Sequence, residues 1–279
     1  MIEIVLVLYG IAPEQSRAFV SLRRHIARLG VDYELVVYNN DTSLHIPDSA
    51  EYVAVNAEGN DMLARAYNYA LQRAAREGRK WLLLLDHDTE VTAEYFEALN
   101  VFVSKAAASP EVVAAVPEVC QQGVYLSPIA YNIHIGPFLY FRKVVCDTPV
   151  SQKQCIVGFN SGAVLDVDFI TSIGGFSEHY PMDMLDYWYF LQIYLHHRKV
   201  IILPVAIEQC LSLMDIAKEM SSERYRNYVA SLSLFAAELG VIARLCLKIK
   251  FVKDMLSQAL SHNKQKFVRY TIKELISIK

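Results

Sequence analysis

Residues 81–89 read Trp-Leu-Leu-Leu-Leu-Asp-His-Asp-Thr, an apolar run that ends in two carboxylates, Asp86 and Asp88. Such a run is typical of a buried β-strand, and the carboxylates follow where the chain leaves the sheet. Paired carboxylate oxygens suit Mg²⁺ or Mn²⁺, which need few protein carboxylates when a substrate diphosphate completes their coordination. The alternative is structural: both aspartates end the strand and cap a helix that begins near Thr89.

Further strands and helices are predicted on the amino-terminal side of this stretch. Apolar runs at 2–8, 33–38 and 52–55 predict strands, and the stretches 14–29 and 62 to about 76 predict helices. Largely apolar strands separated by helices predict a mostly parallel sheet with helices on both faces. Such sheets bind ligands at the carboxyl ends of their strands. Polar side chains fall there: Asn39, Asn40, Asp41 and Asn56, besides Asp86 and Asp88.

The rest of the chain is less regular. Residues 110–157, rich in Tyr, Pro and Gly, are predicted to form strands and long loops that shape a pocket rather than a core. The remaining predicted elements are a helix from 91 to about 107, a strand at 159–165, helices at 167–173 and 186–197, a strand at 200–207, and helices beyond residue 212.

The order of these motifs resembles family 2 glycosyltransferases with the GT-A fold. The motifs that carry the resemblance are Tyr38-Asn39-Asn40-Asp41, Asn56-Ala57-Glu58-Gly59-Asn60, Asp86-His87-Asp88, Asn160-Ser161-Gly162-Ala163, Gly174-Gly175-Phe176-Ser177-Glu178 and Met182-Asp183-Met184-Leu185-Asp186. The Asp-x-Asp followed by Thr is similar to the rhamnosyltransferase-like branch. The resemblance covers about residues 1–215, a Rossmann-like nucleotide-binding domain, and leaves 216–279 as a basic helical extension.

What the resemblance implies is an inverting transfer of a sugar from a nucleoside diphosphate donor, dTDP-rhamnose or a UDP-hexose. The acceptor would be a hydroxyl of a growing surface polysaccharide or of a lipid-linked glycan. A divalent cation, Mn²⁺ or Mg²⁺, would neutralise the departing diphosphate.

The resemblance also implies roles for single residues. Asp88 would bind the metal, and Asp86 would lie near the donor ribose or the water shell of the metal. Asp41 would hydrogen-bond the base. Asn39, the run from Asn56 to Asn60, Arg65, Ser161 and Gly162 would line the donor site. The alternatives are an ordinary turn at 39–41 and a solvated helix face for Arg65.

Inversion requires a general base opposite the leaving group. Asp186 occupies the position of the family's base, and its apolar and aromatic neighbours would raise its pKa by desolvation. Asp183 is the competitor, and the structural alternative for either is a carboxylate at a helix N-terminus. Many relatives also place a His after the last strand as a metal or diphosphate ligand. This chain has Glu208 and Gln209 there, either of which is a candidate substitute.

Composition limits the other classes of function. The chain has 279 residues, 53% of them hydrophobic and 20% charged, with a net charge of -3, so we expect a globular protein without a bulk affinity for nucleic acid. Five cysteines without a close pair, and no window apolar enough to span a bilayer, lead us to expect a cytoplasmic protein. The inner face of the cell membrane is the alternative location.

The charge is unevenly distributed, because residues 240–279 hold nine Lys or Arg against two acids, a net +7 that leaves -10 elsewhere. In this segment apolar and cationic residues alternate. One interpretation is a helix on an anionic bilayer, which would bring the enzyme to a lipid-linked acceptor. The other is a helix that packs on the core or on a partner subunit with a solvated basic face.

Two other functions compete with glycosyl transfer. A strand that leads into Asp-x-Asp also presents the nucleophile of aspartyl-phosphate phosphatases, but here the motif follows the fourth strand and lacks a convincing downstream Lys and acidic pair. A noncatalytic nucleotide-sugar-binding module is favoured if Gln209 has abolished metal binding.

Overall fold

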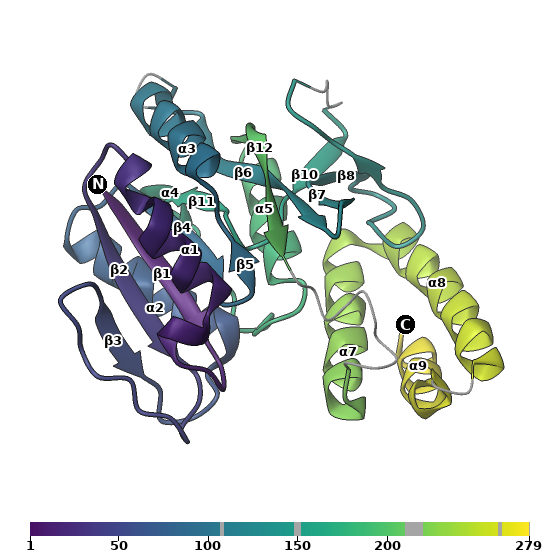
Figure 1. Cartoon of the computed structure of the whole chain (residues 1–279). Helices are drawn as coiled ribbons and strands as arrows, with labels where there is room; N and C mark the ends of the chain where they lie inside the picture. Colours follow the sequence, from purple (N-terminus) through teal and green to yellow (C-terminus); the bar gives the residue numbers. More distant parts are fainter. Residues whose placement is uncertain (107–108, 148–151, 210–219, 262–263, 279) are drawn as a thin grey trace. The chain divides into compact units, whose positions relative to one another are not determined.

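The computed structural model describes residues 1–106, 109–147, 152–209, 220–261 and 264–278 (Figure 1). They divide into two compact units. The first holds 1–106, 109–128, 143–147 and 156–209, and the second holds 129–142, 152–155, 220–261 and 264–278. The boundary predicted between residues 215 and 216 lies outside the described residues.

The first unit is built on one large sheet. Its strands are β1 (Ile2–Leu8), β2 (Tyr33–Asn39), β3 (Val53–Asn56), β4 (Trp81–Asp86), β5 (Thr89–Glu90), β6 (Val112–Gln121), β7 (Val124–Ser127), β11 (Val164–Asp166) and β12 (Lys199–Gln209). Their order is β3-β2-β1-β4-β11-β6-β12-β5, with β7 paired to β6. The strands β1 to β4 run parallel, as do β6 and β12, whereas β11, β5 and β7 are antiparallel to their neighbours. The mostly parallel sheet predicted from the sequence is therefore confirmed.

The register brings the carboxyl ends of four strands together. Val7 of β1 lies opposite both Tyr38 of β2 and Asp86 of β4, while Asn39 of β2 lies opposite Asn56 of β3. The polar residues that follow these strands therefore lie along one edge of the sheet, where parallel α/β sheets bind ligands.

Helices cover both faces of this sheet (Figure 1). They are α1 (Arg17–His25), flanked by 3₁₀ turns at Pro13–Gln15 and Ile26–Arg28, α2 (Met62–Arg76), α3 (Ala93–Ala106), α4 (Val167–Ser172) and α5 (Leu185–Leu195). Phe19 of α1 and Phe96 of α3 share a buried cluster with Leu6 of β1. On the opposite face, α2 contacts β1, β4 and α4. The sheet therefore lies between two layers of helices.

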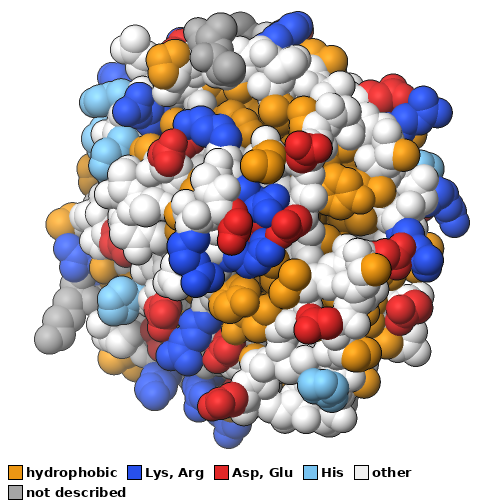
Figure 2. Space-filling view, turned by 90° about the vertical axis from the view of Figure 1, so that its left-hand side faces the viewer, with side chains coloured by type: hydrophobic (Ala, Val, Ile, Leu, Met, Phe, Trp, Pro, Cys, Tyr) orange, Lys and Arg blue, Asp and Glu red, His pale blue; other side chains and the backbone are white. Residues whose placement is uncertain are grey.

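A buried group of charges fixes α2 to the sheet. Glu3 and Glu34 are neighbours in register on β1 and β2. Arg73 Nη1 lies 2.6 Å and Arg79 Nε 2.8 Å from the Glu3 carboxylate, and both arginines also pair with Glu34. Burial raises the pKa of Glu3, whereas the hydrogen bond from Arg73 lowers the pKa of the more exposed Glu34. On the outer face drawn in Figure 2, basic and acidic side chains are also intermixed.

The position of residues 112–121 differs from the prediction that residues 110–157 shape a pocket rather than the core. β6 is instead an interior strand between β11 and β12, and Val112 to Val116 are all buried. Pro117 lies where the pairing with β12 is irregular, between Ile202 and Ala206. A bulge tolerates the missing amide hydrogen of proline inside a sheet.

The second unit contains three helices, α7 (Ser222–Leu239), α8 (Val241–Leu260) and α9 (Gln265–Ser277), which confirm the predicted C-terminal helices. One residue from each helix joins a buried polar contact: Tyr225 Oη lies 2.9 Å from Thr271 Oγ1 and accepts from Gln258 Nε2 at 2.6 Å. A three-stranded sheet has the order β10-β8-β9, formed by Gln154–Val157, Ile129–Asn132 and Arg142–Lys143. Among the described residues, no helix combines the length and apolarity that a membrane span requires.

Candidate active site

Asp86 and Asp88 meet at one amide donor. Gln209, the last residue of β12, donates from Nε2 to Asp86 Oδ2 at 3.1 Å and to Asp88 Oδ1 at 3.4 Å. Gln209 is buried, and its Oε1 has no hydrogen-bond partner among the described residues. Glu208 is exposed and accepts from the backbone of Gln122, away from this pair. Of the two candidate substitutes for the family's histidine, the geometry places Gln209 at the carboxylates.

The turn after β4 is held from behind by Ser161. Its hydroxyl accepts from the backbone of Asp86 at 3.0 Å and is hydrogen-bonded to the Thr89 hydroxyl. Ser161 is fully buried. Gly162 has a φ of +79°, and a Cβ there would lie 2.7 Å from Ile207 and 2.8 Å from Pro117. Both residues, predicted to line the donor site, lie beneath the carboxylates and fix their backbone.

Burial controls the charge of the two carboxylates. Desolvation, with a smaller contribution from Asp88, raises the pKa of Asp86 to about 7. Desolvation also raises the pKa of Asp88. Tyr67 of α2, fully buried, donates from its hydroxyl to Asp86 Oδ1 at 3.2 Å. Two buried carboxylates this close together favour a cation that neutralises both.

Asp186 lies in the first turn of α5 and is electrostatically coupled to Asp86. Burial, with smaller contributions from the charges of Asp183 and Asp86, raises its pKa to about 7. The side chain is half-buried, whereas Asp183 is buried. Met184, the residue before the helix, has a φ of +63°, a left-handed conformation that is costly for a residue with a side chain. The structure thus brings Asp186 into the electrostatic environment of the Asp86 carboxylate.

A second group of predicted residues surrounds the ends of β2 and β3. Asn56 pairs through its carboxamide with both backbone groups of Ile46, at 2.8 Å each, and accepts from Asn39 Nδ2 at 3.0 Å. Asn39 Oδ1 accepts from the backbone of Asp41. Asp41 accepts from the backbone and hydroxyl of Ser43, which together lower its pKa. Asn39 and Asn56 therefore hold the loop that presents the Asp41 carboxylate.

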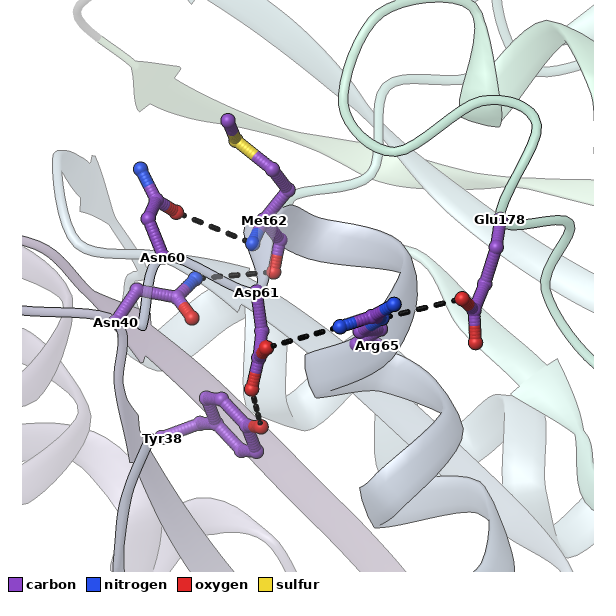
Figure 3. A network of polar contacts seen from close by, with 7 residues as sticks. All are labelled: Tyr38, Asn40, Asn60, Asp61, Met62, Arg65 and Glu178. Carbon is purple, nitrogen blue, oxygen red and sulfur yellow. Dashed lines mark hydrogen bonds and ion pairs between the residues drawn. The ribbon is translucent and has the colours of Figure 1, made fainter. Parts of the chain in front are cut away.

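The start of α2 carries a third group (Figure 3). Arg65 lies between Asp61, at 3.4 Å, and Glu178, at 3.1 Å. Tyr38 donates to the other oxygen of Asp61 at 2.7 Å.

The first residue of α2 is fixed by two asparagines, as Figure 3 also shows. Asn60 accepts from the backbone of Met62 at 3.1 Å, and Asn40 donates to the Met62 carbonyl at 2.9 Å. Met62 has a left-handed φ of +59°. Arg65 is thus a bridge from α2 to the segment before Asp183, and Asn60 fixes a strained helix start.

The donor set at Asp86 and Asp88 fits a hard divalent cation. Among the described residues, no group of three or more His, Cys, Asp or Glu side chains is placed to hold a metal ion. The third oxygen here belongs to an amide: rotation of the Gln209 carboxamide would turn its partnerless Oε1 toward the carboxylates. Two carboxylates and one amide oxygen are ligands that Mg²⁺ and Mn²⁺ accept.

Sequence reasoning missed the aromatic residues of the site. Tyr67 and Tyr189 are both fully buried. The Tyr189 hydroxyl has no hydrogen-bond partner among the described residues. Burial is the main cause that raises its pKa, and the charges of Asp186 and Asp86 raise it as well. In the sequence both tyrosines fit the apolar face of a helix, and nothing in the pattern shows that their hydroxyls lie near carboxylates.

No protein-family model and no curated protein matches this chain. Among solved structures it is similar to S. aureus TarS 1-349, with a TM-score of 0.53 and 11% identity over 99% of this chain and 90% of that one. The complex of TarS 1-349 with UDP-GlcNAc matches with a TM-score of 0.51, 10% identity and the same coverage. The mannosyltransferase PcManGT from Pyrobaculum calidifontis, solved with GDP-Man and Mn²⁺, matches with a TM-score of 0.51 and 12% identity over 99% of this chain and 84% of that one. The neighbours are glycosyltransferases with GT-A-like folds, so the predicted fold is confirmed.

Proposed function

We propose that the protein is an inverting glycosyltransferase of family 2 that transfers a sugar from a nucleoside diphosphate to an acceptor hydroxyl. The observation that carries the proposal is the pair Asp86 and Asp88 at the carboxyl end of β4, held together by the Gln209 carboxamide. The GT-A-like fold supports it, because solved neighbours hold UDP-GlcNAc or GDP-Man with Mn²⁺.

Asp88, Asp86 and Gln209 Oε1 would hold Mn²⁺ or Mg²⁺. The cation would neutralise the negative charge that grows on the departing diphosphate. The protein contributes the turn that Ser161 and Gly162 fix, so both carboxylates are held in place before the donor binds.

The nucleoside lies, in this proposal, along the ends of β2 and β3. Asp41 accepts a hydrogen bond from the base, and Asn39 and Asn56 hold its loop. Arg65 and Asn60, at the start of α2, line the nucleotide side of the donor site in this proposal. The Arg65 guanidinium is exposed there. The donor is dTDP-rhamnose or a UDP-hexose in this proposal, a choice that rests on the resemblance of the sequence motifs.

Asp186 is the proposed general base. A carboxylate with a pKa of about 7 is partly deprotonated at neutral pH and basic enough to take a proton from a hydroxyl as the glycosidic bond forms. Asp183, which is buried, positions the acceptor or the helix start. The acceptor is a hydroxyl of a surface polysaccharide or a lipid-linked glycan.

Binding and turnover together test the proposal. Calorimetry with UDP, dTDP and GDP, in Mn²⁺ and in EDTA, should show a nucleoside diphosphate that binds only with the metal. Hydrolysis of the matching nucleotide sugar in Mn²⁺ should then release the sugar with inverted anomeric configuration. Metal-independent binding without turnover would instead support a noncatalytic module in which Gln209 occupies the carboxylates permanently.

A further inference from the structure

Helix α8 in the second unit carries an apolar stripe on the side away from its packed face. The stripe consists of Ile242, Leu245, Ile249, Val252, Leu256 and Leu260, every one of which is exposed. Leu245 retains 58% and Leu256 56% of its accessible surface. The packed face is formed by different residues, among them Ala243, Leu247 and Phe251. At 3.6 residues per turn these two sets lie on opposite sides of the helix.

Cations border the stripe on both sides. Lys248 and Lys253 flank it along the helix, one at each edge. The acid of this helix, Asp254, pairs with Lys250 at 2.5 Å and lies toward the packed side. The outward surface of α8 therefore combines apolar side chains in the middle with ammonium groups at the margins.

A second exposed apolar group belongs to the same unit. Leu139, Tyr140 and Phe141 follow one another in a loop, and Tyr140 retains 64% of its accessible surface. Gly136, three residues before this run, lies close to Leu239, the last residue of α7, which Gly240 alone separates from α8. Aromatic residues with a polar edge prefer the interface between lipid and water.

We propose that this surface docks on a bilayer that contains anionic lipid. The apolar stripe enters the boundary between headgroups and acyl chains, and the flanking lysines contact lipid phosphates. α8 has 20 residues and so spans about 30 Å, enough to lie along the membrane plane.

A second copy of the chain fits this surface poorly. Stripe-to-stripe pairing in parallel would bring Lys248 of one copy against Lys253 of the other, and antiparallel pairing would also bring lysines together. Flanking charges of one sign disfavour self-association and favour an anionic surface.

Vesicle sedimentation of the full chain tests the proposal independently of catalysis. Vesicles of phosphatidylglycerol and phosphatidylcholine should carry the protein down at low salt, phosphatidylcholine alone should carry far less, and salt should weaken the binding. The double variant Leu245→Ser, Leu256→Ser should partition at least about tenfold less. Its matched control changes exposed apolar residues of the first unit, Val20→Ser with Val101→Ser, and should bind like the unmodified chain.

A second double variant, which reverses the charge of the two flanking lysines, tests the proposal if the serine variant does not fold. Lys248→Glu with Lys253→Glu should also lower binding at least about tenfold. Arg24→Glu with Lys105→Glu, an equal charge change on α1 and α3, should lower it clearly less. Equal binding by the stripe variants and the unmodified chain, or no sedimentation at low salt, would overturn the proposal. So would a dimer in analytical ultracentrifugation that the stripe variants abolish.

Discussion

Asp86 and Asp88 both accept from Gln209 Nε2, an arrangement that a divalent cation can replace with a stronger attraction. We expect Asp88→Asn to weaken nucleoside diphosphate binding at least about tenfold in Mn²⁺ and to leave it unchanged in EDTA, as measured by calorimetry. Asp168→Asn, on the surface of α4, is the control and should behave like the unmodified protein. Equal affinity for the nucleoside diphosphate in all three proteins would show that Asp88 does not bind the metal.

Asp186 is the residue on which turnover should depend most. Because general-base catalysis contributes about 10²–10⁴-fold, Asp186→Asn should lower kcat at least about a hundredfold while donor affinity stays nearly unchanged. Asp183→Asn should lower kcat less than Asp186→Asn does. The reverse order would make Asp183 the base, and full activity in both variants would contradict the transferase mechanism.

The raised pKa of Asp186 also predicts a dependence of stability on pH. Its ordinary pKa is 3.8 and its folded pKa about 7, so the folded state binds the proton more tightly. This carboxyl therefore weakens folding progressively as pH rises from about 4 to about 7. In EDTA, Asp186→Asn should raise the free energy of unfolding by about 1–3 kcal/mol more at about pH 8 than at about pH 5. Denaturant titrations that give the same difference at both values would exclude a raised pKa.

The sequence singles out Asp86 and Asp88 because their setting is local, an apolar strand that ends in two carboxylates. Asp186 is singled out by the family resemblance alone. The sequence leaves Glu208 and Gln209 as equal candidates, since choosing between neighbours requires knowing which face of β12 each occupies. Tyr67 escapes prediction because a buried tyrosine and a site tyrosine have the same periodicity.

At the scale of elements, the turn at Gly162 joins β4 to the strands around it. Its backbone donates to Leu84 at 2.8 Å, and added atoms would meet Pro117 of β6 and Ile207 of β12. Gly162→Ala should therefore lower the free energy of unfolding by about 2–4 kcal/mol, from crowding and a positive φ together. Gly174→Ala, at φ +92° with open space around it, should cost only about 1 kcal/mol in the same denaturant titration. Similar losses would show that packing at Gly162 is unimportant.

The sequence predicts a strand correctly where a short, uninterrupted apolar run ends at polar or turn-forming residues, as in β1, β2 and β4. For β6 a strand agrees with the strands and loops predicted over 110–157, but its place in the core is not predicted, because that place depends on pairing with β12, some 80 residues later. For β11 the prediction of 159–165 is too long: pairing begins only at Val164, after the turn at Gly162.

At the scale of the whole chain, we expect a ligand to stabilise the first unit and not the second. The carboxylates and the proposed nucleoside residues all belong to the first unit. Mn²⁺ with a nucleoside diphosphate at about a hundred times its dissociation constant should stabilise that unit by about 2.7 kcal/mol. For a domain of this size, this raises its melting temperature by roughly 5–10 °C. Calorimetry of the Asp88→Asn variant should show no such shift, and an equal shift there would place the ligand elsewhere.

The charged group beneath α2 has a kinetic consequence. Glu3 and Glu34 lie side by side in paired strands, and they repel each other until Arg73 and Arg79 arrive. Pairing of β1 with β2 before α2 docks therefore carries a repulsion between like charges that the complete structure does not have. The association of these two strands and the docking of α2 should occur in one cooperative event, so the transition state for folding should contain all three elements. Before α2 has docked, the parallel pair of β1 and β2 would hold two unneutralised glutamates side by side, so a sheet that forms early should separate again easily.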